Sequence, residues 1–69
     1  MINELDLHGI RHNEVERLVE NLILLNERWN IICGNSDKMI QIVKDKLDWA
    51  YNNHGVEWHK PTHNTFSSL

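Results

Sequence analysis

The sequence predicts a two-layer α/β sandwich in which two helices cover one face of a mixed, mostly parallel sheet. Two long segments carry apolar residues at three- and four-residue spacing, which is the period of an α-helix. Short β-rich stretches precede, separate and follow these segments, so the expected order is β-α-β-α-β with a further strand at the end. This alternation favours parallel strands joined by right-handed crossovers. Because two helices cover only one face of such a sheet, we expect the other face to meet solvent.

The first half of the chain predicts a strand followed by an amphipathic helix. Residues 2–7 alternate loosely between apolar and polar side chains, and Gly9 ends the strand that they predict. Asn13 is the expected N-cap of the helix, because its side-chain oxygen accepts an otherwise unpaired backbone N–H group. We expect the helix to run to about Asn26. Its expected buried face consists of aliphatic side chains at helical spacing: Val15, Leu18, Val19, Leu22 and Leu25.

The middle of the chain repeats this order. Residues 29–33 are rich in β-forming side chains and predict the second strand. The second helix is expected to start at a cap formed by Ser36 or Asp37. It is expected to end where Asn53 or Gly55 adopts the left-handed conformation. Its expected buried residues recur at helical spacing: Met39, Ile40, Val43, Leu47, Ala50 and Tyr51.

The end of the chain predicts two short strands. Residues 56–59 predict the third strand, which Pro61 is expected to break because proline lacks a backbone N–H group. Residues 64–69 predict a short strand at the edge of the sheet. The three tryptophans are expected in the core or at its rim rather than as stacking platforms for bases: Trp29, Trp49 and Trp58.

Length and composition limit the class of protein. With 69 residues, the chain predicts a single domain, 1–69. The formal net charge of −3 does not favour a polyanion, so any contact with nucleic acid has to be local. Cys33 has no second cysteine to pair with, which is typical of a reducing compartment. The longest apolar run, residues 22–25, is far too short to span a membrane, and the first residues lack the features of a signal peptide. We expect a cytoplasmic protein without membrane contact, and a monomer by default.

Two ionisable side chains stand at the end of the first predicted strand. Leu5 and Leu7 point to one face of that strand, so Asp6 and His8 point to the other. Ligands of α/β sheets bind beyond the carboxyl ends of strands, where a parallel neighbour brings residues 33–36 close to His8. The second helix starts there, and its free N–H groups suit a phosphate. His8 can act as a general acid, or as a base towards water or a ribose 2′-OH, while Asp6 orients it or binds a divalent ion.

Two motifs resemble a known family. Residues 5–9 read LDLHG and are followed, after four variable residues, by a glutamate and an apolar helix; this pattern resembles the opening motif of the Smr (small MutS-related) domain family. The second motif of that family is a strand ending in T-G-x-G or H-G-x-G before a helix. Residues 31–36 are similar to it, with Gly34 at the first glycine. Cys33 replaces the Thr or His, and Ser36 replaces the second glycine.

The resemblance implies an α/β sandwich similar to the C-terminal domain of bacterial translation initiation factor three, and a function on nucleic acid. Several family members nick DNA or cleave RNA, and the aspartate and histidine of the first motif are the residues implicated. Carried over, the catalytic residues are Asp6 and His8, and Asn64 is similar to an asparagine that precedes the last strand. Mg²⁺ or Mn²⁺ is the candidate cofactor, with undefined ligands. The residues expected to contact RNA or DNA are Gly9, Arg11, His12, Gly34, Asn35, Ser36 and Lys38.

Several functions stay open at this point. The first is an endonuclease, which the intact LDLHG favours. The second is a non-catalytic module that binds RNA, DNA or a ribosomal surface, which the net negative charge and the altered second motif favour. A third is a protein-interaction domain without affinity for nucleic acid. Asp6 and His8 also suit a structural role, in which Asp6 accepts backbone donors of the Gly34 loop and His8 caps the strand. Cys33 is expected to be a small buried residue and not a nucleophile.

Overall fold

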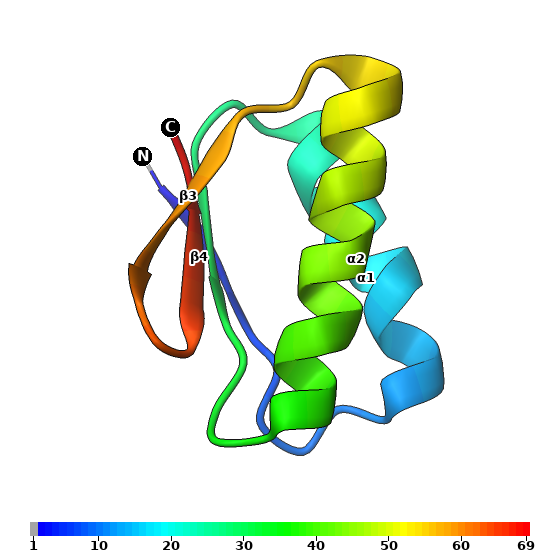
Figure 1. Ribbon diagram of the computed structural model, residues 1–69, viewed down its shortest axis with the longest axis vertical. Helices are drawn as coiled ribbons and strands as arrows, with labels where there is room; N and C mark the ends of the chain where they lie inside the picture. Colours follow the sequence, from blue (N-terminus) through cyan, green and yellow to red (C-terminus); the bar gives the residue numbers. More distant parts are fainter. Residues whose placement is uncertain (1) are drawn as a thin grey trace.

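The computed structural model describes residues 2–69, in which two helices pack on one face of a four-stranded mixed sheet (Figure 1). The α/β class predicted from the sequence is therefore confirmed. Met1, the first residue of the predicted domain 1–69, lies outside the described residues. No helix within residues 2–69 is long and apolar enough to cross a bilayer. The elements in chain order are β1 (Asn3–Asp6), α1 (His12–Leu25), β2 (Trp29–Ile32), α2 (Asp37–His54), β3 (Trp58–Thr62) and β4 (Thr65–Ser68).

The strands lie in the order β1-β2-β4-β3. Only β1 and β2 are parallel, whereas β4 pairs antiparallel with both β2 and β3. The expectation that most of the sheet is parallel is wrong for this reason. The crossover through α1 makes β1 and β2 parallel, but a two-residue turn joins β3 to β4, and so short a connection permits only an antiparallel hairpin. β4 is thus an interior strand, and the prediction that it forms an edge is also wrong.

Pro61 lies inside β3 and does not break it. The strand runs from Trp58 to Thr62, later than the predicted residues 56–59. β3 pairs on one side only, and a proline without an N–H group is tolerated on an edge strand. The pairing with β4 shifts register between His59 and Thr62, around the proline.

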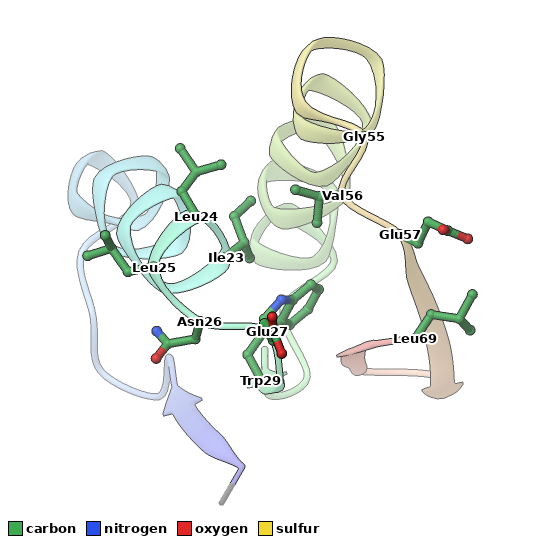
Figure 2. Close-up of a pocket in the computed structure, with 10 residues that line it drawn as sticks. All are labelled: Ile23, Leu24, Leu25, Asn26, Glu27, Trp29, Gly55, Val56, Glu57 and Leu69. Atoms are coloured by element: carbon green, nitrogen blue, oxygen red, sulfur yellow. The ribbon is translucent and has the colours of Figure 1, made fainter.

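The start and the buried face of α1 differ from the prediction. The N-cap is Arg11, without a side-chain cap hydrogen bond, and Asn13 lies within the first turn. The buried residues are Val15, Val19 and Ile23, which recur every four residues. Leu25, expected in the core, is 78% exposed. Figure 2 shows Ile23 pointing towards α2 and Leu25 pointing away from it.

Both caps of α2 follow the sequence prediction. The hydroxyl oxygen of Ser36 accepts the N–H of Met39 at 3.2 Å. Gly55 ends the helix with a left-handed φ of 68°, and its N–H donates to the carbonyl of Tyr51 at 3.1 Å. Tyr51 itself is 59% exposed, so its expected place in the core is wrong. The remaining five predicted residues of this helix are buried: Met39, Ile40, Val43, Leu47 and Ala50.

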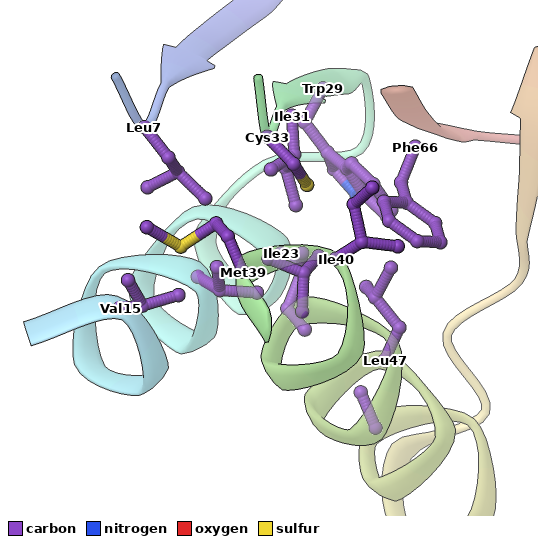
Figure 3. Close-up of a cluster of buried hydrophobic side chains, with 13 residues drawn as sticks. Leu7, Val15, Ile23, Trp29, Ile31, Cys33, Met39, Ile40, Leu47 and Phe66 are labelled. Carbon is purple, nitrogen blue, oxygen red and sulfur yellow. The ribbon is translucent and has the colours of Figure 1, made fainter. Parts of the chain in front are cut away.

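The core lies between the helices and the sheet (Figure 3). Trp29 and Phe66 are its largest fully buried side chains and come from the two interior strands. Trp58 meets Phe66 edge to face, with ring centroids 5.5 Å apart, and together with Trp49 it lies at the margin of the core. The predicted core or rim positions of the tryptophans are therefore confirmed. This packing holds the ends of β1 and β2 in a fixed relation, on which the candidate site depends.

Candidate functional site

Three connections meet at the edge of the sheet where β1 and β2 end. Backbone hydrogen bonds join them: the N–H of Leu7 donates to the carbonyl of Ile32 at 2.9 Å, and that of Cys33 donates to the carbonyl of Asn64 at 2.8 Å. Parallel pairing aligns the end of β1 with the end of β2, and β4 begins there because it runs antiparallel to β2. Both helices also start at this side of the molecule (Figure 1). The predicted approach of the first two loops is confirmed.

Asp6 and His8 form a hydrogen-bonded pair at this edge. Oδ1 of Asp6 lies 2.5 Å from Nδ1 of His8 and also accepts the backbone N–H of His8 at 2.9 Å. Both hydrogen bonds lower the pKa of the Asp6 carboxyl below its ordinary value, and the bond from the backbone N–H of His8 has the larger effect. Asp6 takes no donor from the Gly34 loop among its hydrogen bonds, which differs from the structural role considered above.

The charge state of Asp6 determines the tautomer of His8. An ionised carboxylate only accepts hydrogen bonds, so Nδ1 of His8 must be the donor in the contact with Asp6. The second ring nitrogen, Nε2, takes no part in the contact with Asp6. The side chain of His8 is 64% exposed, and that of Asp6 is 57% exposed, so the pair is open to solvent.

Gly34 lies against the imidazole of His8. A Cβ atom at Gly34 would stand 2.8 Å from Nε2 and 3.0 Å from Cδ2 of His8, which is closer than packed side chains approach. The φ of Gly34 is 75°, a left-handed conformation that glycine adopts easily. Both the contact and the backbone conformation require glycine here. The loop after β2 therefore forms a wall against which the ring of His8 is held.

Three other predicted site residues have different surroundings. Gly9 lies in a turn closed by the N–H of Ile10 and the carbonyl of Leu7 at 3.1 Å, and a Cβ at Gly9 would meet nothing within 4 Å. Its φ of 76°, and not a close approach, accounts for this glycine. The hydroxyl of Ser36 caps α2, and Asn35 is exposed beside it.

Three cationic or titratable side chains border the edge. Arg11 and His12 stand exposed at the start of α1, and Lys38 stands exposed in the first turn of α2. Their positions at the two helix starts suit a phosphate backbone that passes over the Asp6–His8 edge. None of the three contacts Asp6 or His8 through an ion pair among the described residues.

The turn between β3 and β4 adds a third connection that spacing alone did not predict. Asn64 touches the end of β2 through its carbonyl, and the exposed His63 precedes it. The resemblance singled out Asn64, but no periodicity or motif in the sequence indicates that β4 pairs with β2. That β4 lies beside β2 is visible only in the strand order of the folded sheet.

The donor set at this edge does not form a metal site by itself. Within residues 2–69 no three or more His, Cys, Asp and Glu side chains gather closely enough to hold a metal ion. Asp6 offers one carboxylate, of which Oδ1 already binds His8. Mg²⁺ prefers six oxygen ligands, so a cation here would take most of its ligands from water and a phosphate.

Cys33 is buried, with 3% of its surface exposed. Burial raises the pKa of its thiol to about 11, so the thiol stays protonated near neutral pH. A protonated, inaccessible thiol is a poor nucleophile, in agreement with the expectation from sequence. Cys33 thus contributes its backbone N–H to the edge, through Asn64, and its side chain to the core.

Comparison with known proteins gives no relative for this site. No protein-family model, no curated protein and no solved structure matches the chain. The resemblance of residues 5–9 to the first Smr motif therefore stays a prediction.

Proposed function

We propose that the chain is an Smr-type endonuclease that binds RNA or DNA and cleaves a phosphodiester bond at the Asp6–His8 edge. One observation carries the proposal: Oδ1 of Asp6 lies 2.5 Å from Nδ1 of His8, so the carboxylate orients the ring and the second ring nitrogen, Nε2, is not used in this contact. An oriented imidazole next to a carboxylate, open to solvent, is an arrangement that general acid–base catalysis uses.

The proton transfers follow from that orientation. Nε2 of neutral His8 accepts the proton of the attacking oxygen, which belongs to water or to a ribose 2′-OH, while this oxygen bonds to phosphorus. The bond from phosphorus to the leaving oxygen breaks, and the leaving oxygen takes a proton from the imidazolium or from water. The carboxylate of Asp6 holds the ring and stabilises the imidazolium as it forms. Such acid–base catalysis contributes on the order of 10²–10⁴ in rate.

Binding in this proposal is local. The whole chain carries a formal charge of −3, so attraction of a polyanion has to come from Arg11, His12 and Lys38 and from backbone N–H groups of the loop at Gly34. Each phosphate neutralised releases counterions, and we therefore expect affinity to fall steeply as salt rises. Mg²⁺ or Mn²⁺ stays a candidate cofactor of this reaction.

The second candidate is a module that binds RNA, DNA or a ribosomal surface without cleaving it. It is favoured by Ser36, which replaces a motif glycine and whose hydroxyl is engaged in capping α2. The net negative charge points the same way. This candidate uses the same edge and the same flanking side chains, and it differs only in lacking turnover.

A cleavage assay separates the two. Wild type, Asp6→Asn, His8→Ala and the control His59→Ala are prepared identically and incubated with structured RNA, single-stranded DNA and supercoiled plasmid. Each reaction runs with Mg²⁺, with Mn²⁺ or with a chelator. His59 is an exposed histidine of β3, so its variant controls for removal of a histidine elsewhere. We expect cleavage by wild type and His59→Ala, and a loss of about 10²–10⁴ in His8→Ala.

The opposite outcomes are as informative. Equal cleavage by all four proteins would indicate a contaminating nuclease and would leave the pair without a catalytic role. No cleavage by any protein, with salt-sensitive binding retained, would favour the binding module. Absence of binding even at low salt would favour a protein-interaction domain.

A further inference from the structure

A groove opens at the end of the molecule opposite the Asp6–His8 edge. The C-terminal ends of α1 and α2 enclose a pocket of about 380 Å³, lined in part by Leu24, Glu27 and Val56. Figure 2 shows Ile23 and Val56 facing each other between the two helices. A second pocket of about 310 Å³ is lined in part by Tyr51 and Trp58. Glu57 and Leu69 line both pockets, and we call the two together the helix-end groove.

Exposed apolar side chains gather at this groove. Five large hydrophobic side chains are exposed in the part of the chain that the structure describes, and four of them line the groove. Patches of this kind on an otherwise polar surface mark sites of interaction with other molecules. The four are Leu24, Leu25, Tyr51 and Leu69.

The groove is acidic. Glu27 and Glu57 line it, and neither takes part in an ion pair within residues 2–69. Asp48 also lines it but is paired with Lys44 at 2.9 Å. No lysine or arginine is among the described residues that line it. Two helix C-termini also lie here, and each carries partial negative charge; α1 has no basic residue in its last turn.

We propose that the helix-end groove binds a basic amphipathic segment of another protein. One or two apolar side chains of that segment enter the groove between Leu24 and Val56, and its lysine or arginine side chains lie over Glu27 and Glu57. The charge of the groove selects this partner, because an acidic or phosphate-bearing ligand is repelled there. An amphipathic helix laid into an apolar groove is a common recognition mode. The site is distant from Asp6 and His8, so both surfaces can be occupied at once.

The test uses a fluorescent peptide of roughly 15 residues, long enough to form a helix, with leucine at helical spacing and lysine elsewhere. A second peptide has glutamate at every lysine. Binding is measured by anisotropy, and the site is mapped from amide chemical shifts in NMR spectra. We expect the lysine peptide to bind, with the largest shifts at Leu24, Val56 and Glu57, and the glutamate peptide not to bind.

Two matched double variants separate the groove from net charge. The double variant Glu27→Lys with Glu57→Lys reverses the charge of the groove. The control Glu4→Lys with Glu16→Lys makes the same change in net charge at exposed residues of β1 and of α1. We expect the groove variant to bind about tenfold more weakly, and the control to bind like wild type. Leu24→Ser, at a side chain that is 41% exposed and so tolerant of polarity, should weaken binding by a similar factor.

Three results would overturn the proposal. The first is equal binding of both peptides, because charge then plays no part in selection. The second is an equal loss of affinity in both double variants, because the effect then comes from net charge and not from the groove. The third is concentration-dependent dimerisation of the wild type that Leu24→Ser abolishes, because a second copy of the chain then covers the groove.

Discussion

Replacing Gly34 with alanine tests whether the contact between the two loops positions His8. The φ of Gly34 is 75°, and a residue with a Cβ atom pays about 1–2 kcal/mol for this left-handed conformation. The new Cβ would stand 2.8 Å from Nε2 of His8, and because the imidazole is exposed we expect it to relieve the clash by turning. Turning separates Nδ1 from Asp6, which now lies 2.5 Å away. We expect a loss of about 1–2 kcal/mol in stability together with loss of the oriented imidazole.

Gly55→Ala is the matched control. Gly55 has a similar φ of 68°, but a Cβ there would meet nothing within 4 Å. Both variants should lose similar stability, and each kcal/mol of lost stability should lower the melting temperature by about 4–8 °C. Only Gly34→Ala should change the ¹⁵N shifts of the His8 ring and reduce cleavage or binding of nucleic acid. Wild-type ring shifts and activity in Gly34→Ala would refute the reasoning, because Gly34 would then not position the ring.

Three further outcomes can be measured. The pKa of Asp6 is lowered from 3.8, so its stabilising effect is complete above that pH and is lost as pH falls through the lowered value; the difference in unfolding free energy between wild type and Asp6→Asn should shrink in acid. Burial raises the pKa of Cys33 to about 11, so a thiol reagent at neutral pH should label it slowly until denaturant unfolds the chain. Ser36→Ala should cost about 1 kcal/mol, measured by denaturant titration, because it removes the cap bound to Met39.

Each of these three outcomes tests a structural feature of the candidate site and has a result that would contradict it. Fast labelling of Cys33 in the folded chain would contradict its burial, and unchanged stability of Ser36→Ala would contradict the cap seen at Met39. A constant difference between wild type and Asp6→Asn across the acid range would contradict the hydrogen bonds assigned to Asp6.

Features that depend on a few neighbouring residues could be predicted from the sequence. Both helices, the cap at Ser36 and the left-handed end at Gly55 follow from local spacing and backbone chemistry. The pairing of Asp6 with His8 is also local, although not for the predicted reason: β1 ends at Asp6, and Oδ1 of Asp6 accepts the backbone N–H of His8 in the turn that follows the strand. The wrong expectations for Leu25 and Tyr51 arise at helix ends, where periodicity continues but no neighbouring element covers the side chain.

Features that join distant segments could be decided only by the tertiary structure. Whether a strand is interior or at an edge depends on its partners, so Pro61 fits β3 and β4 lies beside β2 for reasons that local sequence does not contain. The contact of His8 with Gly34 and the helix-end groove have the same origin, because each combines residues far apart in the chain. The sequence by itself determined the two helices, the caps of α2 and the proximity of the Asp6 carboxylate to the His8 imidazole. Packing of the two layers decided what those groups face, since only folding brings separate loops within contact distance.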